Sequence, residues 1–317
     1  LSAPKPYFLF RSRKAALFSP LSELAERRRG LTSPKAAFFY FPNPHFVIRR
    51  GSEVTELMER RTADASLQIE NRFLEPMLLK IKRHQAIEIT EADGFGLFIP
   101  PLDPSELEGT GVKKYLDYGD QLYGDNLTRH GTRERPWYSI PKPSPAPILL
   151  PSLYLARYAA FWNPNDFVAS NPFFEVRPHE DVNALELLAI MNSSLTALML
   201  EFSGRYRENR DRTITNQISL DDMARAPILD PRKLTREVRT ELREAVRPLL
   251  HFQQSADGLV NPRDIAARKQ LDEIIFLKAL DVTVTEMQDA IDGLSRLISR
   301  RLRLGSSEIG GTEDEEQ

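Results

Sequence analysis

The sequence contains no cysteine among its 317 residues. Disulfide bonds, thiolate zinc sites and cysteine nucleophiles are therefore excluded, and a chain without cysteine suits a reducing compartment. No apolar run approaches the roughly 20 residues that a membrane-spanning helix needs, and no signal peptide opens the sequence. The first residue is Leu1 rather than a methionine, which indicates a fragment or a processed product. We expect a soluble cytoplasmic protein with no membrane partner.

Recognisable metal and phosphate sites are also missing. The five histidines are scattered, and no two of them have the spacing of metal ligands. No Gly-rich phosphate loop of the Walker type is present. Asp221 and Asp222 could bind magnesium, but their place at a turn or helix start favours a capping role. We expect no metal site in this chain.

The sequence has no strong overall charge, since its formal net charge is −2. Four acidic residues (Glu313 to Glu316) lie in the last segment, so the rest of the chain is slightly basic. Local charge governs polyanion binding more than the total does. Arginine is clustered at 27–29, 49–50, 60–61 and 205–212. The alternative interpretation of each cluster is a solvated helix face.

Hydrophobic periodicity predicts a mixed succession of elements in the first 125 residues. Ala36–Phe41 and Phe46–Ile48 have the pattern of short buried strands. Ile69–Ile81 and Val112–Leu122 have apolar residues at helical spacing. Ile87–Ile89 and Phe95–Ile99 again indicate strands.

Prolines are frequent in the next stretch of the chain and change the elements that it can form. Nine prolines between residues 128 and 180 exclude long helices there and leave room only for short strands. The strands expected in this stretch are Ile148–Leu150, Leu153–Leu155, Phe167–Val168 and Phe173–Val176. Four helices are expected after it, at Asp181–Phe202, Lys233–Phe252, Ile265–Leu280 and Thr283–Leu304, with Asp181 and either Thr283 or Thr285 as caps. The predicted fold class is α+β: small strands mixed with long helices, followed by an α-helical C-terminal extension.

An ordered series of short segments runs through residues 69–302. Its members are Ile69-Glu-Asn-Arg-Phe-Leu-Glu-Pro-Met-Leu78, Lys114-Tyr-Leu-Asp-Tyr-Gly119, Arg135-Pro-Trp-Tyr138, Leu149-Leu-Pro-Ser152, Asn171-Pro-Phe-Phe174, Leu188-Ala-Ile-Met-Asn-Ser-Ser-Leu195, Gly204-Arg205, Ile218-Ser-Leu-Asp-Asp-Met-Ala-Arg-Ala-Pro-Ile228, Lys269-Gln-Leu-Asp-Glu-Ile-Ile275 and Ser299-Arg-Arg-Leu302. In this order the series resembles the specificity region of TaqI-like adenine-N6 DNA methyltransferases and of the larger fused restriction–modification enzymes.

The resemblance implies the recognition half of such an enzyme. Residues 67–230 would be an α+β DNA target-recognition domain, and residues 231–304 its helical C-terminal region. Residues 1–66 would be a remnant of the catalytic domain or the junction to it, and residues 305–317 a disordered acidic tail. The implied partners are double-stranded DNA and a methyltransferase catalytic domain in the same chain or in another one, in the cytoplasm of a prokaryote. Assembly of the chain into a homo-oligomer is a further possibility.

Two stretches combine the residue types that a reader of DNA sequence needs. Basic groups bind phosphates, while planar or amide side chains contact base edges. The candidate DNA-binding residues are Arg129, Arg133, Arg135, Trp137, Tyr138, Arg205, Arg207, Arg210, Arg212, Asn216 and Gln217. Each stretch has an alternative: Trp137 and Tyr138 could anchor a small core, and the arginines of 205–212 could form an ion-paired turn with Glu208 and Asp211.

Catalytic motifs are incomplete. In the resembling enzymes an Asn-Pro-Pro-aromatic loop holds the flipped adenine. Here Asn43-Pro-His-Phe46 and Asn171-Pro-Phe-Phe174 each lack the second proline, and no Gly-rich turn precedes the first of them. We therefore expect no catalytic residue and no cofactor in this chain, although S-adenosylmethionine is implied for the parent enzyme. The alternatives are a stand-alone nuclease or degenerate methyltransferase, and a helical scaffold with residues 233–304 as a subunit interface.

Overall fold

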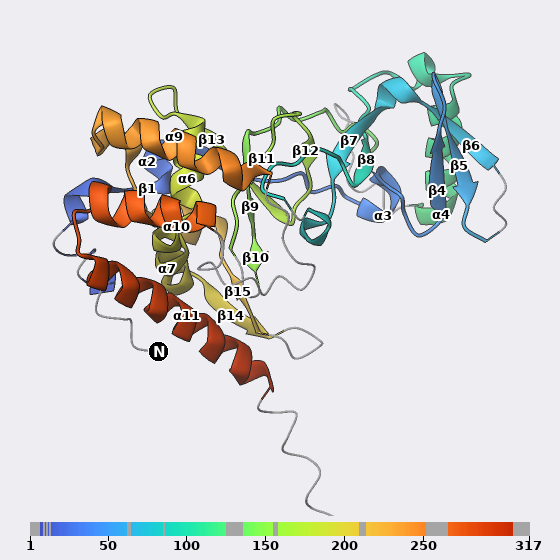
Figure 1. Cartoon of the computed structure of the whole chain (residues 1–317). Coiled ribbons are helices and arrows are strands. Elements are labelled where there is room, and N and C mark those ends of the chain that lie inside the picture. Colours follow the sequence, from blue (N-terminus) through green and yellow to red (C-terminus); the bar gives the residue numbers. More distant parts are fainter. Residues whose placement is uncertain are drawn as a thin grey trace, which may run out of the picture.

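The computed structural model describes residues 7–8, 10, 12, 14–61, 65–84, 86–124, 136–154, 158–208, 214–251 and 266–306. Small sheets and helices alternate along the chain, which confirms the predicted α+β class. Figure 1 shows helices gathered at one end of an elongated molecule, a helix-backed sheet at the other end, and short strands between them. Residues 307–317 of the expected acidic tail lie outside the described residues.

The far end of the molecule is a three-stranded antiparallel sheet backed by one helix. The sheet consists of β4 (Phe46–Arg50), β5 (Val54–Glu59) and β6 (Ala65–Glu70), and the helix is α4 (Gly111–Tyr123). The Glu70 carboxylate accepts hydrogen bonds from the backbone N–H groups of Gly111 and Val112, at 2.7 and 3.1 Å, and so joins β6 to the first turn of α4. A β-carbon at Gly111 would lie 2.4 Å from the Gln68 carbonyl oxygen, so only glycine allows this close approach.

The segment Ile69–Ile81 was expected to be helical, and that prediction is wrong. It contains the end of β6, a 3-10 turn η2 (Asn71–Phe73) and strand β7 (Leu74–Leu78). Pro76 would remove a hydrogen bond from a helix interior, and the strand buries the apolar residues Leu74, Met77 and Leu78 as a helix face would have done. The expected strand Ala36–Phe41 is likewise a short helix α3 (Ala36–Phe39) followed by β3 (Tyr40–Phe41).

Two four-stranded sheets form the middle of the molecule. One has the order β12-β7-β8-β3, with β8 at Gly94–Leu97 and β12 at Val168–Ala169. The other has the order β11-β9-β13-β2, with β2 at Ala25–Arg29, β9 at Ile148–Pro151, β11 at Phe161–Trp162 and β13 at Phe173–Pro178. The short strands expected between the prolines are therefore present, and all four residues of β9 are buried.

Strands from the first 66 residues pair with strands much later in the chain. β1 (Phe18–Pro20) pairs with β16 (Pro227–Leu229), and β2 pairs with β13. The boundary expected between residues 66 and 67 falls inside β6. The hydrophobic clusters follow the pairing: one covers much of residues 38–140, and a larger one combines residues 10–25 with many residues from 148 to 297.

The helix expected at Asp181–Phe202 is two helices, α6 (Ala184–Met191) and α7 (Ser194–Ser203), bent by 69°. The break falls where Asn192 bonds sideways to the backbone of Ala160 and the Ser193 side chain caps α7. Asn183 rather than Asp181 caps α6. Within the described ranges no single helix could cross a membrane; the bent pair has the length and composition to do so, but it is packed inside the protein.

The remaining elements are mostly helical, as expected. Strands β10 (Leu153–Tyr154), β14 (Arg205–Glu208) and β15 (Ile214–Gln217) form one more small sheet. The helices are α2 (Leu21–Leu24), α8 (Leu220–Arg225), α9 (Arg236–Leu250), α10 (Ala266–Glu273) and α11 (Val284–Ser306), with a π-helical turn η7 (Ile274–Ala279) and 3-10 turns η1 (Ala15–Leu17), η3 (Ile81–Arg83), η4 (Pro104–Leu107) and η5 (Pro231–Lys233). Ser219 caps α8, and Thr283 and Glu286 form the expected capping box of α11.

Buried charges join the helices. The fully buried Glu186 of α6 pairs with Arg239 and Arg243 of α9. Asp272 of α10 accepts hydrogen bonds from the backbone N–H and the hydroxyl of Ser194, at 2.8 and 2.6 Å. Burial raises the pKa of Asp272 to about 6, although the bonds from Ser194 and the nearby Arg268 act in the opposite direction.

The raised pKa of Asp272 predicts a pH dependence of stability. Because this pKa is higher in the folded chain than in the unfolded chain, the folded state binds the proton more tightly. The contribution is present below about pH 4 and is lost as the pH rises through about 6. We expect the free energy of unfolding of the unmodified protein to fall over this range by roughly 3 kcal/mol relative to Asp272→Asn. Urea titrations at several pH values measure the difference, with the exposed Asp221→Asn as control. Parallel curves for the protein and Asp272→Asn would contradict the assignment.

Candidate nucleic-acid interface

A two-stranded hairpin, β14–β15, extends directly from the buried helix α7 (Figure 1). Gly204 connects helix and hairpin, and a β-carbon there would lie 1.9 Å from the Asn216 amide oxygen, so the turn is tightly packed. β14 is an edge strand whose four residues are all exposed. An exposed edge strand with charged side chains is suited to contact with another molecule.

Strand register divides the hairpin into two faces. Arg205 lies opposite Gln217, and Arg207 lies opposite Thr215. Opposed residues in an antiparallel pair share a face, and so do residues two apart, so these four side chains form one face. We call Arg205, Arg207, Thr215 and Gln217 the outer face. The other face contains Tyr206 and Asn216, which are also opposed.

The two outer-face arginines differ from the arginines of the other sequence clusters in their bonding partners. Arg28 bonds to Glu175 and to the Ser144 carbonyl, Arg49 bonds to Glu56 at 2.6 Å, and Arg60 bonds to the Asn43 carbonyl at 2.7 Å. Arg205 and Arg207 are exposed and form no ion pair with any residue in the described ranges. Both side chains are exposed to solvent, and after the hydrogen bond from Ser219 the charge of Arg205 helps to lower the pKa of the nearby Asp222 carboxyl.

The inner face is anchored to the protein by an ionic cluster whose members are buried except for the exposed Tyr206. Its members are Tyr154 of β10, Glu201 of α7, Tyr206, Asn216 and Arg301 of α11, and we call it the Glu201 cluster. The Arg301 guanidinium donates to both Glu201 carboxylate oxygens, at 2.7 and 3.4 Å, and to the Ile214 carbonyl at 3.1 Å. Arg301 also lies over the rings of Tyr154 and Tyr206, with centroid distances of 5.6 and 5.7 Å.

Hydroxyl and amide groups complete the Glu201 cluster. The Asn216 amide donates to the Tyr154 hydroxyl at 2.8 Å, and the Tyr206 hydroxyl donates to Glu201 at 3.4 Å. Burial, together with the charge of Glu201, raises the pKa of Tyr206 to about 12. The cluster therefore keeps its hydroxyl groups protonated and holds the inner face in one arrangement.

The structure corrects the role expected for Asn216. Its side chain is fully buried, and the amide is engaged with Tyr154 and Glu201, so it cannot reach a base edge from this position. Strand alternation explains the difference, because Asn216 and Gln217 must point to opposite faces. Thr215, which was not among the candidates, takes its place on the outer face, where its hydroxyl donates to the Arg207 carbonyl at 3.2 Å and its oxygen can still accept a bond. Alternating residue positions within 214–217 are the sequence signal that could have found it.

Trp137 and Tyr138 are also corrected. Trp137 packs edge-on against Phe39 and close to Phe38, and Tyr138 is 8% exposed, with its hydroxyl donating to the Leu102 carbonyl. Both rings pack in or against the core around α4, as the alternative interpretation held: Tyr138 is buried and Trp137 is partly buried. Five other candidates lie outside the described residues: Arg129, Arg133, Arg135, Arg210 and Arg212.

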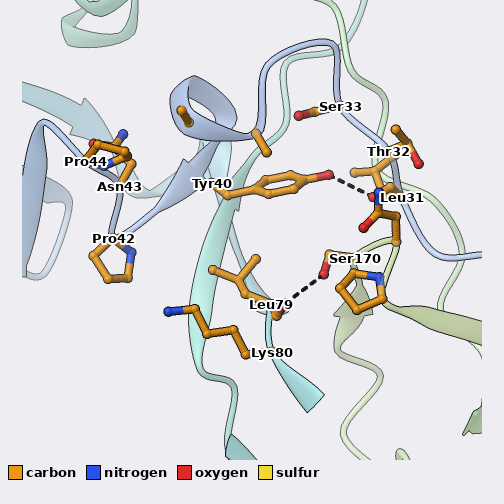
Figure 2. Close-up of a pocket in the computed structure, with 14 residues that line it drawn as sticks. Leu31, Thr32, Ser33, Tyr40, Pro42, Asn43, Pro44, Leu79, Lys80 and Ser170 are labelled. Atoms are coloured by element: carbon orange, nitrogen blue, oxygen red, sulfur yellow. Dashed lines mark hydrogen bonds between the residues drawn. The ribbon is translucent and has the colours of Figure 1, made fainter. Parts of the chain in front are cut away.

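Both incomplete Asn-Pro motifs line one pocket of about 260 Å³ between the two middle sheets (Figure 2). Asn43 is not available to a ligand, because its amide oxygen accepts bonds from the backbone N–H groups of His45 and Phe46, at 3.0 and 2.8 Å. The remaining walls are largely apolar, and Tyr40 donates to the Leu31 carbonyl. The pocket therefore does not reproduce an adenine-binding loop.

The described residues do not fit S-adenosylmethionine either. A methyl-donor site needs a Gly-rich turn after a strand of a doubly wound parallel sheet, whereas the sheets described here are antiparallel apart from the pairing of β12 with β7. Nor do these residues include a group of three or more His, Asp or Glu side chains that could hold a metal ion.

Comparisons with known proteins give two similar structures and one matching family. Its fold resembles that of the type IIG restriction endonuclease BpuSI, with a TM-score of 0.59 and 16% identity over 95% of this chain and 33% of that one. The type IIL restriction-modification enzyme MmeI, solved with DNA, gives a TM-score of 0.49 and 12% identity over 91% of this chain and 36% of that one. The chain thus spans about a third of either enzyme. No curated protein matches its sequence. The family described as type II methyltransferase M.Eco57I, C-terminal domain, matches residues 7–207, and the chain belongs to that family.

Proposed function

We propose that this chain recognises a short sequence in double-stranded DNA, and that the outer face of β14–β15 makes the contact. The observation that carries the proposal is the outer face itself: two exposed arginines without ion-pair partners in the described ranges, beside Thr215 and Gln217. Membership in a family of methyltransferase C-terminal domains supports a role on DNA.

The geometry of the hairpin suits the major groove. That groove, about 12 Å wide, admits a two-stranded β-ribbon. An arginine can pair with guanine or bind a phosphate, a glutamine can pair with adenine, and a threonine can contact either kind of base edge. The outer face therefore offers both phosphate-binding and base-reading groups on a rigid support.

We further propose that the methyl transfer itself belongs to a separate catalytic domain, in the same polypeptide or in a partner chain. The ordered series of segments through residues 69–302 supports a TaqI-like enzyme that methylates N6 of adenine. The catalytic domain would bind S-adenosylmethionine, and this chain would hold the DNA in position for it. The proposed setting is the prokaryotic cytoplasm.

The first test removes the two outer-face charges. Arg205→Ala combined with Arg207→Ala should weaken binding to a fluorescent random-sequence duplex, because an arginine that binds a phosphate releases counterions from DNA. We expect the slope of log affinity against log salt to become shallower by about 1 for each arginine–phosphate pair that the substitutions remove. Fluorescence anisotropy between about 50 and 200 mM salt measures both quantities.

Arg49→Ala combined with Arg50→Ala is the matched control. It removes the same charge from another strand, where Arg49 pairs with Glu56 and Arg50 lies over the Phe95 ring. The control should keep the affinity and slope of the unmodified chain. Equal losses in the two double variants would assign the effect to net charge, and no salt-dependent binding by the unmodified chain would reject the proposal.

The second test addresses base reading. Thr215→Ala combined with Gln217→Ala should change which duplexes are enriched from a randomised pool while leaving the salt dependence intact, because neither side chain is charged. Removing an amide–base pair costs about 1–3 kcal/mol, or about 5- to 150-fold in affinity for the preferred duplex. Thr285→Ala with Gln288→Ala, two exposed positions on α11, serves as control. If the Thr215/Gln217 variant enriches the same sequence as the unmodified chain, residues other than these two must contact the bases.

A further inference from the structure

The Glu201 cluster connects parts of the chain that the family match separates. The match ends at residue 207, inside β14. Tyr154, Glu201 and Tyr206 lie within it, whereas Asn216 and Arg301 lie beyond it. Arg301 is 100 residues from Glu201 in sequence, yet its side chain is fully buried and contacts three elements: α7, β10 and the hairpin. Figure 1 shows α11 running alongside β14 and β15.

Each member of the cluster on the hairpin lies between two outer-face residues. Tyr206 separates Arg205 from Arg207, and Asn216 separates Thr215 from Gln217. In a strand, neighbouring side chains point to opposite faces, so the direction of one fixes the direction of the next. On the inner face, Tyr206 bonds to Glu201 and lies under the Arg301 guanidinium. Asn216 bonds to the Tyr154 hydroxyl. The direction of the outer face is consequently set by contacts on the inner face.

Arginine is the side chain that this arrangement requires. Its planar group donates from Nε and Nη2 to the Glu201 carboxylate while Nη1 donates to the Ile214 carbonyl at the start of β15. A lysine ammonium has the same charge but no fork and no flat surface to lie over two aromatic rings. Glu186 is an equally buried carboxylate, but its partners Arg239 and Arg243 are each 34% exposed, and the contacts join α6 to α9 without any residue of the hairpin.

We propose that Arg301 is a positioning residue for DNA recognition. Through the Glu201 cluster, Arg301 of helix α11 fixes the orientation of the outer-face side chains of the β14–β15 hairpin. The inference rests on the proposed function and extends it to a helix outside the family match. Loss of the cluster should impair sequence discrimination more than general affinity, because base pairing depends on angle and distance, whereas attraction to phosphates by Arg205 and Arg207 is long-range and tolerant of direction.

The experiment compares two duplexes of equal length. One is the duplex that the unmodified chain enriches from a randomised pool, and the other is its scrambled sequence. The readout is the ratio of the two affinities, measured by fluorescence anisotropy on the full chain, together with the salt slope for the scrambled duplex. Arg301→Lys should lower the ratio by about tenfold or more, the loss expected when at least one bidentate base contact is misplaced, and should leave the slope unchanged.

Two further variants separate positioning from folding. Glu201→Gln with Arg301→Gln removes both charges together and so avoids an isolated buried charge, which is strongly destabilising. It should lower the ratio as Arg301→Lys does. Glu186→Gln perturbs the comparable ion pair far from the hairpin and should leave the ratio unchanged, whatever it does to the unfolding midpoint in urea.

The outcomes distinguish this inference from the proposed function. A preserved ratio in both Arg301 variants, or an equal loss of affinity for both duplexes, would overturn the positioning role and leave DNA recognition standing. A reduced ratio in Glu186→Gln would also overturn it, because the effect would then follow general destabilisation. If the unmodified chain binds both duplexes alike, sequence recognition itself fails, and the inference fails with it.

Discussion

A carboxylate withdrawn from water must be paired or hydrogen-bonded, and this requirement connects the parts of the molecule. Glu201, Glu186, Asp230 and Asp272 are all nearly inaccessible to solvent. Each is satisfied by a group from another element or a distant segment. Isolated buried charges are costly, so the packing of helices and small sheets is restricted to arrangements in which these partners meet. The strands are short, so each sheet has only a few hydrogen bonds between its strands. The buried ionic contacts therefore add to the restrictions on how the elements pack together.

Features encoded within a few residues could be predicted from the sequence. The prolines between 128 and 180 limited the strands to two to six residues, and Thr283 with Glu286 marked the start of α11. Local patterns failed where two conformations share one apolar spacing. Ile69–Ile81 suited a helix by spacing, but Pro76 and the use of Glu70 as a cap for α4 favoured strands. The break between α6 and α7 depends on Asn192 reaching Ala160, a partner 32 residues away.

The candidate interface shows the same limit. Arg205, Arg207 and Gln217 could be proposed because arginine and amide side chains are the types that contact DNA. Whether Asn216 or Thr215 accompanies them depends on which face of β15 is covered, and that depends on Arg301. No local pattern links positions 201 and 301. Trp137 likewise has the residue type of a stacking group, yet Phe38 and Gly119 provide a packing site for its ring.

The separation of Glu201 and Arg301 has a consequence for engineering. A boundary drawn after residue 207 cuts β14 before its last residue, separates it from β15 and leaves a buried carboxylate without its cation. A recognition element of this kind is therefore discontinuous in sequence. To transplant it into a related scaffold, α7, the hairpin and the last helix would have to move together, or the recipient would have to supply an arginine of its own at the same place.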